Sequence, residues 1–211
     1  MIGPSGKRLA VLISGRGSNL QSILDATKAR DLDAAVVVVV SNRDAAAGLQ
    51  RAREAGVEAI CLPSRGRSSR DEYDRALAEM LTARGIDLVC LAGFMRLVGA
   101  PLLEAFPQRV LNIHPSLLPS FPGLDAQRQA IDHGVQFSGA TVHFVTPELD
   151  AGPIVLQAAV PVLPADTEAT LSARILIEEH RLYPRAIGIV LAGGWTINGR
   201  RFIPAQAART T

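Results

Sequence analysis

The stretch that decides the fold is Ala34-Ala35-Val36-Val37-Val38-Val39-Val40-Ser41. Its five consecutive valines are β-branched, and β-branched side chains favour extended backbone. An unbroken apolar run of this length is typical of a strand that is covered on both faces, because a half-exposed strand would alternate with polar residues. The stretch therefore predicts an inner strand of a sheet that has helices packed on both sides.

Short apolar runs alternate with helical patterns on either side of this strand. Further strands are predicted at Arg8–Ser14, Val57–Leu62 and Asp87–Ala92, and helices at Ser18–Ala29, Ala45–Ala55 and Arg70–Ala83. The alternation predicts an α/β fold with a mostly parallel, twisted sheet, helices on both faces and right-handed crossovers. Ligands of such sheets bind at the carboxyl ends of the strands, so functional residues are expected there.

The second half of the chain is less regular. We predict a helix at Pro101–Phe106, strands at Arg109–Ile113, Gly139–Val145 and Ile154–Val160, a loop at Pro115–Gly123, and one long helix or two over Thr167–Val190, because Pro184 should kink or break it. The domain plan is a flexible leader at residues 1–7, a single domain at 8–192 and a C-terminal tail at 193–211. A terminal strand pair around Asn198-Gly199 is expected in that tail.

Composition narrows the class of protein. With 48% apolar and 20% charged residues among 211, the chain is globular rather than disordered. A net charge of +2 offers no reason to expect nucleic acid or a membrane surface as partner. No segment reaches the ~18 apolar residues of a membrane span. Cys61 and Cys90 lie in apolar runs and are predicted to be buried thiols, which fits a cytoplasmic location.

A glycine-rich turn, Ser14-Gly15-Arg16-Gly17-Ser18-Asn19, joins the first predicted strand to the first helix. Backbone N–H groups at a helix N-terminus bind anions such as phosphate, and Ser18 and Asn19 can either bind the anion or cap the helix. Leu20 stands where a dinucleotide-binding motif needs a third glycine, and no Walker A lysine follows. A tight turn with a good cap explains the loop equally well.

The most informative stretch is Leu111 to Pro119, which contains Asn112 and His114. Residues two apart on a strand share a face, so an amide donor and a titratable imidazole lie side by side where Pro115 ends the strand. Such a pair suits acyl transfer, because the amide can donate to an oxyanion and the imidazole can exchange protons near pH 7. A structural histidine remains the competing interpretation.

A second polar cluster, Thr146 to Pro153, contains Asp150 before a Gly-Pro turn. An aspartate beside His114 would orient the imidazole and raise its pKa, but the sequence does not place the two residues together. A turn residue that bonds its own backbone is the alternative. The four histidines show no ligand spacing and the cysteines sit in apolar runs, so no metal site is expected.

Four ordered segments together resemble the phosphoribosylglycinamide formyltransferases, the folate-dependent enzymes of purine biosynthesis. They are Ile13–Leu20, Leu91–Arg96, Leu111–Pro119 and Val142–Asp150, and the resemblance extends from about Arg8 to about Pro184. It implies a Rossmann-like formyltransferase fold. It also implies transfer of a formyl group from 10-formyltetrahydrofolate, the co-substrate, to the amine of phosphoribosylglycinamide (GAR), in a monomer or homodimer.

The resemblance further assigns roles to individual residues. Gly17, Ser18 and Asn19 would hold the substrate phosphate, and Asn112, His114 and Asp150 would be catalytic. Arg70, Met95, Arg96, Leu97, Val98 and Asn112 would contact the folate, and Glu179 the ribose or glycinamide of GAR. Taken without the resemblance, Arg70 and Glu179 would pass for solvated helix charges, and Met95, Leu97 and Val98 for ordinary core.

Two departures and three alternatives complete the sequence picture. Asp125 and Gln127 stand where many relatives carry histidine, and Ala151-Gly152 where many carry Gly-Gly.

A formyl-methionyl-tRNA-forming enzyme is disfavoured because it usually has an extra C-terminal domain. A formylfolate hydrolase usually has an N-terminal regulatory domain. A non-catalytic phosphosugar- or nucleotide-binding module would need the glycine loop but not the Asn–His–Asp set.

Overall fold

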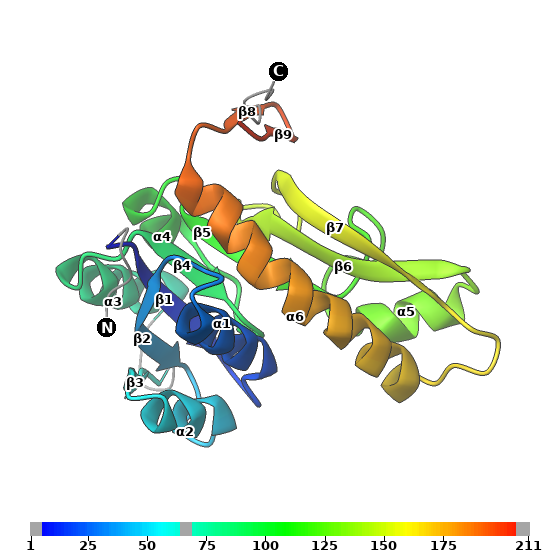
Figure 1. Cartoon of the computed structure of the whole chain (residues 1–211), viewed down its shortest axis with the longest axis horizontal. Coiled ribbons are helices and arrows are strands. Elements are labelled where there is room, and N and C mark those ends of the chain that lie inside the picture. Colours follow the sequence, from blue (N-terminus) through cyan, green and yellow to red (C-terminus); the bar gives the residue numbers. More distant parts are fainter. Residues whose placement is uncertain (1–5, 64–68, 206–211) are drawn as a thin grey trace.

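A computed structural model describes residues 6–63 and 69–205. Within these residues nine strands form one sheet, in the order β3-β2-β1-β4-β5-β6-β7-β9-β8 (Figure 1). The strands are β1 (Arg8–Ile13), β2 (Ala35–Ser41), β3 (Glu58–Cys61), β4 (Leu88–Leu91), β5 (Val110–His114), β6 (Phe137–Phe144), β7 (Ile154–Pro161), β8 (Thr196–Asn198) and β9 (Arg201–Ile203). The helices are α1 (Ser18–Ala29), α2 (Ala47–Glu54), α3 (Arg70–Ala83), α4 (Ala100–Ala105), α5 (Ala126–Asp132) and α6 (Glu168–Ala192).

The sheet has a parallel half and an antiparallel half that meet at β5. Strands β3, β2, β1, β4 and β5 are parallel neighbours, whereas β6 runs antiparallel to both β5 and β7. This confirms the predicted mostly parallel α/β sheet. The reversal at β5 means that the segment after β6 returns from the opposite end of the sheet.

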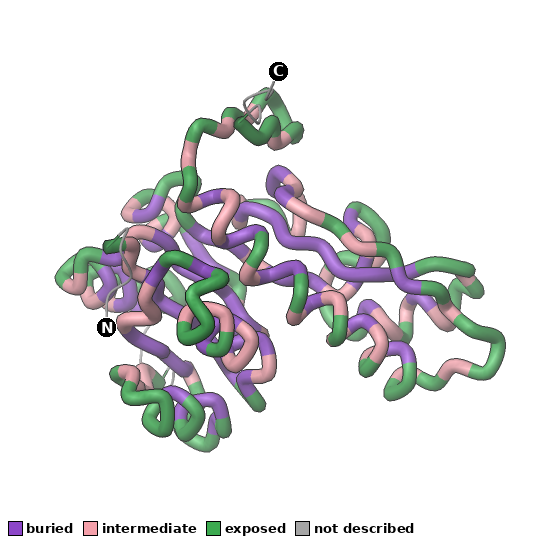
Figure 2. The backbone as a smooth tube through the Cα atoms, in the orientation of Figure 1, coloured by how far each residue is buried: buried purple, intermediate pink, exposed green. Residues whose placement is uncertain are grey.

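Helices cover both faces, as predicted, and the strands alternate between two cores. In β1, Leu9, Val11 and Ile13 pack in the core that contains residues of α1 and α6, while Ala10 and Leu12 pack in the core that contains residues of α3 and α4. The strands and the inner side of α6 hold most of the buried residues (Figure 2). In the valine run, Val39 packs in the first of these cores and Val38 and Val40 pack in the second, whereas Val36 and Val37 are only half-buried.

Helix α6 runs unbroken through Pro184, so the expected kink or break does not end it. Proline removes one backbone hydrogen bond, a cost that packing along the rest of a helix can offset. The residue before it supplies such packing: the fully buried Tyr183 hydroxyl donates to the carbonyl oxygens of Leu91 (2.9 Å) and Leu111 (3.1 Å). These bonds fix α6 against β4 and β5.

Three local features differ from or extend the sequence analysis. Helix α5, directly after the proline-rich loop, was not predicted, because its seven residues are too few to show a clear helical period. Cys61 is half-buried rather than buried, while Cys90 is buried, and both thiols are free. The predicted terminal strand pair is present as β8 and β9.

Aromatic contacts hold the C-terminal hairpin. Trp195 and Phe202 pack against Phe144 of β6, with ring centroids 5.2 and 6.0 Å away. The predicted leader lies largely outside the described residues, as do the last six residues of the predicted tail. The division of the chain at residues 8, 192 and 193 stays a prediction.

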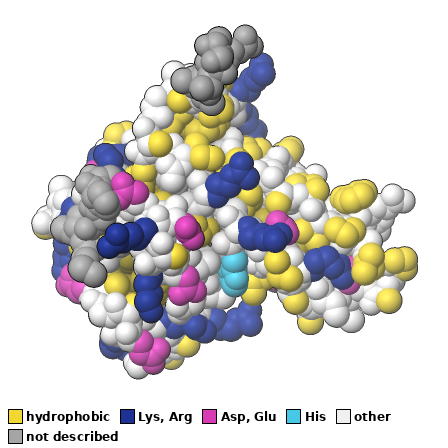
Figure 3. Space-filling view, in the orientation of Figure 1, with side chains coloured by type: hydrophobic (Ala, Val, Ile, Leu, Met, Phe, Trp, Pro, Cys, Tyr) yellow, Lys and Arg dark blue, Asp and Glu magenta, His cyan; other side chains and the backbone are white. Residues whose placement is uncertain are grey.

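Charges of both signs are interspersed on the face shown in Figure 3, in keeping with the small net charge. Among the described residues, no helix is both long and apolar enough to cross a membrane.

Candidate active site

The predicted Asn–His pair lies on the sheet face opposite α6. Leu111 and Ile113 belong to the core on the α6 side, so Asn112 and His114, which alternate with them in β5, face the other way. The antiparallel register sets His143 opposite Asn112, and Thr141 opposite His114. Four polar side chains therefore share one patch of the sheet where the parallel and antiparallel halves meet.

Asp150 reaches this patch from the loop between β6 and β7. One carboxylate oxygen lies 3.5 Å from Nδ1 of His114, and the other lies 3.6 Å from Nε2 of His143. The first oxygen also accepts a 2.8 Å hydrogen bond from the Gly123 amide. The Asp150 side chain is 10% exposed. The structure thus brings Asp150 beside His114, which the sequence could not place, and also beside His143.

Backbone carbonyls determine which ring nitrogens carry protons, because a carbonyl oxygen can only accept. Nε2 of His114 donates to the Phe121 carbonyl at 2.8 Å, which leaves Nδ1 facing Asp150. Nδ1 of His143 donates to the Phe144 carbonyl at 2.9 Å, which leaves Nε2 to accept from the Asn112 amide at 3.2 Å. His143 is therefore a neutral ring whose free nitrogen faces both Asn112 and Asp150.

Burial lowers the pKa of His143, because the protein interior disfavours its charged form. The Phe144 carbonyl and Asp150 oppose this effect, and the neighbouring His114 adds to it. A neutral imidazole next to a carboxylate can take up a proton that a reaction releases.

Hydrogen bonds hold the loop between Pro115 and Gly123 over the site. The Thr141 hydroxyl donates to the Ser116 carbonyl (2.7 Å) and accepts from the Leu118 amide (3.1 Å). The Gln157 amide group donates to the Leu118 carbonyl and to the Thr141 hydroxyl. Side chains of β6 and β7 therefore set the position of the loop whose Phe121 carbonyl orients His114.

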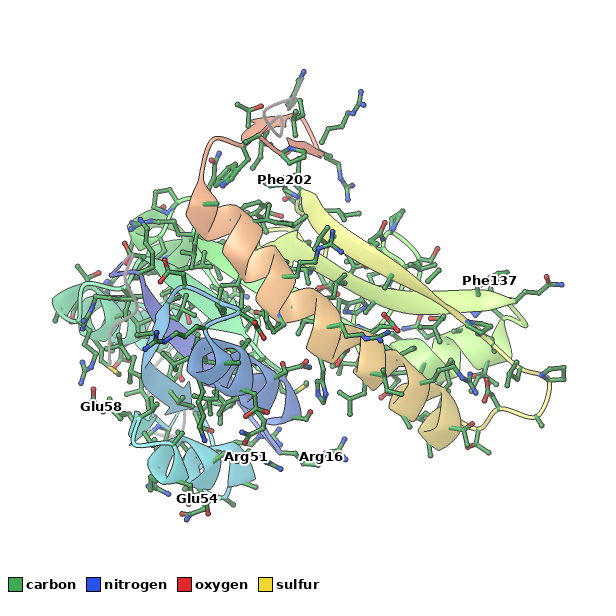
Figure 4. The ribbon with its side chains drawn as sticks, viewed as in Figure 1. Arg16, Arg51, Glu54, Glu58, Phe137 and Phe202 are labelled. Atoms are coloured by element: carbon green, nitrogen blue, oxygen red, sulfur yellow. The ribbon has the colours of Figure 1, made fainter. Side chains whose placement is uncertain are left out.

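The glycine loop after β1 is shaped for close backbone contact. Gly17 has a φ of 73°, a left-handed conformation that favours glycine, and a Cβ there would stand 2.7 Å from the Gly48 Cα. Arg51 donates to the Arg16 carbonyl at 3.0 Å, and both arginines lie at the α2 end of the molecule (Figure 4). No side chain caps α1. The capping role considered for Ser18 and Asn19 is absent, which leaves the helix N-terminus open.

Asn19 instead contacts α6. Its side-chain amide donates to Glu179 at 2.8 Å, and its side-chain carbonyl oxygen, Oδ1, is buried without a hydrogen-bond partner among the described residues. Glu179 is only 7% exposed, so the idea of a solvated helix charge was wrong. Burial raises the pKa of Glu179, and the hydrogen bond from Asn19 partly opposes that rise. The predicted phosphate loop and the predicted ribose contact are thus joined directly.

The segment after β4 presents apolar side chains at the same end of the sheet. Met95 and Leu97 are each 55% exposed, whereas Val98 is buried, so two of the three were not ordinary core. Arg96 stacks on the ring of Tyr73, 4.4 Å from its centroid. Arg70 begins α3 and packs close to Gly99, because its Nε would lie only 3.4 Å from a Cβ added at that glycine.

These groups lie within reach of one small ligand. Strand β4 separates β1 from β5, so the ends of β1 and β5 are about 10 Å apart at ordinary strand spacing. The ligand would meet the glycine loop at one end and His114 at the other. No cluster of three or more His, Cys, Asp or Glu side chains suited to a metal ion occurs in the described ranges.

Sequence reasoning overlooked His143 as a member of this cluster. A signal was present, because Thr141 and His143 alternate with apolar residues in β6 as Asn112 and His114 do in β5. Two polar residues on one face of an inner strand are unusual, and pairing the two strands in register would have brought all four together.

The fold and the site define a transferase class, and comparison with known proteins agrees. Residues 7–187 match the family model described as formyl transferase, and the chain belongs to that family. Phosphoribosylglycinamide formyltransferase of Escherichia coli (strain K12) is 44% identical over 200 residues, which cover 95% of this chain and 92% of that protein. The crystal structure of glycinamide ribonucleotide transformylase 1 from Symbiobacterium toebii has 56% identity and a TM-score of 0.94, over 96% of each chain.

Larger proteins also contain a matching region. The trifunctional purine biosynthetic protein adenosine-3 of Drosophila melanogaster is 48% identical over 195 residues. These residues are 92% of this chain but 14% of that protein, so the chain spans about a seventh of its length.

Proposed function

We propose that this chain transfers the formyl group of 10-formyltetrahydrofolate to the amine of GAR, giving formyl-GAR and tetrahydrofolate, in purine biosynthesis. One observation carries the proposal: a glycine-rich loop at an uncapped helix N-terminus and an Asn–His–Asp cluster lie two strands apart at one end of one sheet. The similarity to the Escherichia coli enzyme supports GAR as the acceptor.

The glycine loop is assigned to the substrate phosphate and the β5 patch to the formyl group. Gly17, Ser18 and Asn19 form the N-terminus of α1, which no side chain caps, and backbone amides at such a terminus would stabilise a phosphate. Glu179, which is held by Asn19, would accept hydrogen bonds from ribose or glycinamide groups. Arg70 and the segment from Met95 to Val98 would contact the folate.

The chemistry needs an oxyanion site and a route for protons. The GAR amine attacks the formyl carbon, and the carbonyl oxygen becomes an oxyanion. Asn112 and protonated His114 would donate to it, with Nδ1 of His114 as the donor because Nε2 is bonded to Phe121. Asp150 stabilises the charged ring of His114. Neutral His143 adds an acceptor for the proton that the amine loses. The tetrahedral intermediate then collapses: the bond between the formyl carbon and N10 of the folate breaks, and N10 takes up a proton, so that formyl-GAR and tetrahydrofolate are released.

Folate is a co-substrate here, and no metal enters the proposed reaction. We also propose a cytoplasmic location, which the free thiols of Cys61 and Cys90 support. GAR and formyl-folate would be the partners of this site. Residues 8–192 would form the catalytic domain, as a monomer or a homodimer.

The decisive test is a spectrophotometric assay of formyl transfer with 10-formyl-5,8-dideazafolate, with and without GAR. Wild type, His114→Ala and His133→Ala are compared. His133 is the control: it is exposed directly after α5, and although its ring packs on the Phe121 ring (centroids 5.3 Å apart), the Phe121 group that contacts His114 is a backbone carbonyl. We expect folate release that requires GAR, falls about 10²–10³-fold in His114→Ala and is retained in His133→Ala.

Other outcomes identify the alternatives. Folate release without GAR would indicate a formylfolate hydrolase. Binding of GAR and folate without release would indicate a binding module, and an unchanged rate in His114→Ala would remove His114 from the mechanism.

A further inference from the structure

The segment from Met95 to Val98 is anchored at both ends by side chains outside it. At its start, the Met95 amide donates to the Ser14 hydroxyl at 2.8 Å. Directly after its end, the Gly99 amide donates to the Asp74 carboxylate at 2.6 Å. Between these anchors Met95 and Leu97 project into solvent, each 55% exposed. Exposed apolar side chains on a backbone fixed at two points form a preorganised contact surface.

Asp74 is an unusual residue for such an anchor. It lies on α3, is 1% exposed, and occupies a position where leucine and alanine neighbours form ordinary core. A buried carboxylate is costly unless hydrogen bonds and opposite charges compensate it. Here the compensating groups are the Gly99 amide and the guanidinium groups of Arg96 and Arg70, while Asp71 adds a like charge.

The space around Gly99 shows how closely α3 and this segment fit. A Cβ at Gly99 would lie 2.9 Å from the Asp74 carboxylate, 3.3 Å from Asp71 and 3.4 Å from Arg70. Gly99 has an ordinary backbone conformation, so only the close approach of the carboxylate requires glycine. Arg96 is clamped on the same helix by the ring of Tyr73. Side chains of the first two turns of α3 therefore determine the position of residues 95–99.

We propose that Asp74 is a positioning residue that holds the Met95–Val98 segment, and with it Arg96, in the shape that binds the folate co-substrate. The inference rests on the proposed function for the identity of that ligand. By this proposal Asp74, a residue of α3, controls the affinity for the folate co-substrate. Asp74 lies on α3, outside both the β5 patch and the glycine loop.

The test uses two variants that disturb the contact from opposite sides. Asp74→Asn keeps a hydrogen-bond acceptor for Gly99 but removes the charge that faces Arg96 and Arg70. Gly99→Ala keeps Asp74 and pushes the segment away from it. Matched controls are Glu79→Gln, an exposed carboxylate on the same helix, and Gly188→Ala, where the nearest atom to an added Cβ is 3.7 Å away.

Steady-state kinetics with 10-formyl-5,8-dideazafolate and GAR give the main measurement. We expect the KM for folate to rise about tenfold in Asp74→Asn and Gly99→Ala, with kcat and the KM for GAR within about twofold of wild type. Both controls should match wild type. An unchanged folate KM in both test variants overturns the proposal, as does a parallel loss of kcat and of both KM values, which would mean a general structural role.

Hydrogen exchange separates this proposal from the proposed function. The amides of Met95 to Gly99 should exchange at least about tenfold faster in Asp74→Asn than in wild type and Glu79→Gln, because the Gly99 hydrogen bond is weakened. If wild type fails to use folate, the proposed function falls. Exchange then still decides whether Asp74 holds the segment, and unchanged exchange refutes that role.

Discussion

The parallel half of the sheet and its antiparallel half differ in how they build function. In the parallel half, strands β1 and β4 end in loops that lie at one edge, and each loop carries its own proposed binding residues in sequence order. In the antiparallel half, His143 lies within β6, and Asp150 reaches the site from a loop that folds back over the sheet. The proposed binding groups thus come from local loops, whereas the proposed catalytic set needs both halves.

The difference has a physical cause. Parallel strands all point the same way, so the turns after them meet at one edge without further arrangement. An antiparallel neighbour delivers its following loop to the other end, and that loop must turn back to reach β5. The loop between β6 and β7 turns back with a left-handed backbone at Asp150 (φ 49°) and tight packing at Gly152.

The largest expected effect is on catalysis and comes from the antiparallel half. Asp150→Asn should lower kcat by about 10²–10⁴-fold, because a neutral amide stabilises neither charged His114 nor a protonated His143. The measurement is the GAR-dependent rate at saturating substrates. Glu148→Gln, an exposed carboxylate in the same loop, is the control and should keep full activity. A kcat within about threefold of wild type would show that the carboxylate is dispensable.

The next largest effect is on folding stability, and it tests the packing of the loop between β6 and β7. A Cβ on residue 152 would stand 1.8 Å from the Phe144 carbonyl oxygen, so Gly152→Ala should cost about 3 kcal/mol or more of folding stability. Denaturant unfolding measures it. Ala151→Gly, which creates the Gly-Gly of many relatives, should cost no more than about 1 kcal/mol. Equal stability of wild type and Gly152→Ala would contradict the packing argument.

The corresponding glycine of the parallel half should affect binding most. Gly17→Ala places a Cβ 2.7 Å from Gly48 in a left-handed conformation, which distorts the amides around it. We expect the KM for GAR to rise about tenfold or more, while the KM for folate changes little. Gly15→Ala meets no atom within 4 Å and should behave as wild type. A changed folate KM with an unchanged GAR KM would reverse the assignment of the loop.

The smallest expected effect is on thermal stability, and it comes from Glu179. Its pKa is raised in the folded state, so its contribution to stability is present below pH 4.5, the ordinary value, and is lost as the pH rises through the folded pKa. Glu179→Gln keeps an acceptor for Asn19 and removes that loss. Its Tm should exceed that of wild type by about 2–4 °C at about pH 8, and by less near pH 4.5.

Thermal unfolding at both pH values checks this expectation. Glu178→Gln, which removes a partner of Arg181 on the same helix, should lower Tm slightly at both. A Tm for Glu179→Gln below wild type at the higher pH would mean that the carboxylate is stabilised by its site. The KM for GAR should rise in Glu179→Gln, because the amide accepts more weakly from the substrate.

Much of the fold could be predicted because its signals are local. The bounds of α1 and α3 agree with the sequence patterns, since a glycine turn precedes one and a capping serine, Ser69, the other. The prediction of the helices was incomplete in two places: it left one long helix or two open over residues 167–190, and it missed α5. Pro184 does not break α6, because Tyr183 and its neighbours fix the helix to the sheet, and short α5 has too weak a period of its own.

By itself, the sequence determined the α/β class, the order of the elements apart from α5, the shared face of Asn112 and His114, and the glycine turn of the proposed anion site. These follow from periodicity and backbone sterics over a few neighbouring residues. Only the tertiary structure decided that Asp150 lies beside both His114 and His143, that Glu179 is buried against Asn19, and that Asp74 anchors Gly99. The contacts of Asp74 with Gly99 and of Asn19 with Glu179 join residues 25 and 160 positions apart, and strand register and helix packing determine them rather than any local pattern.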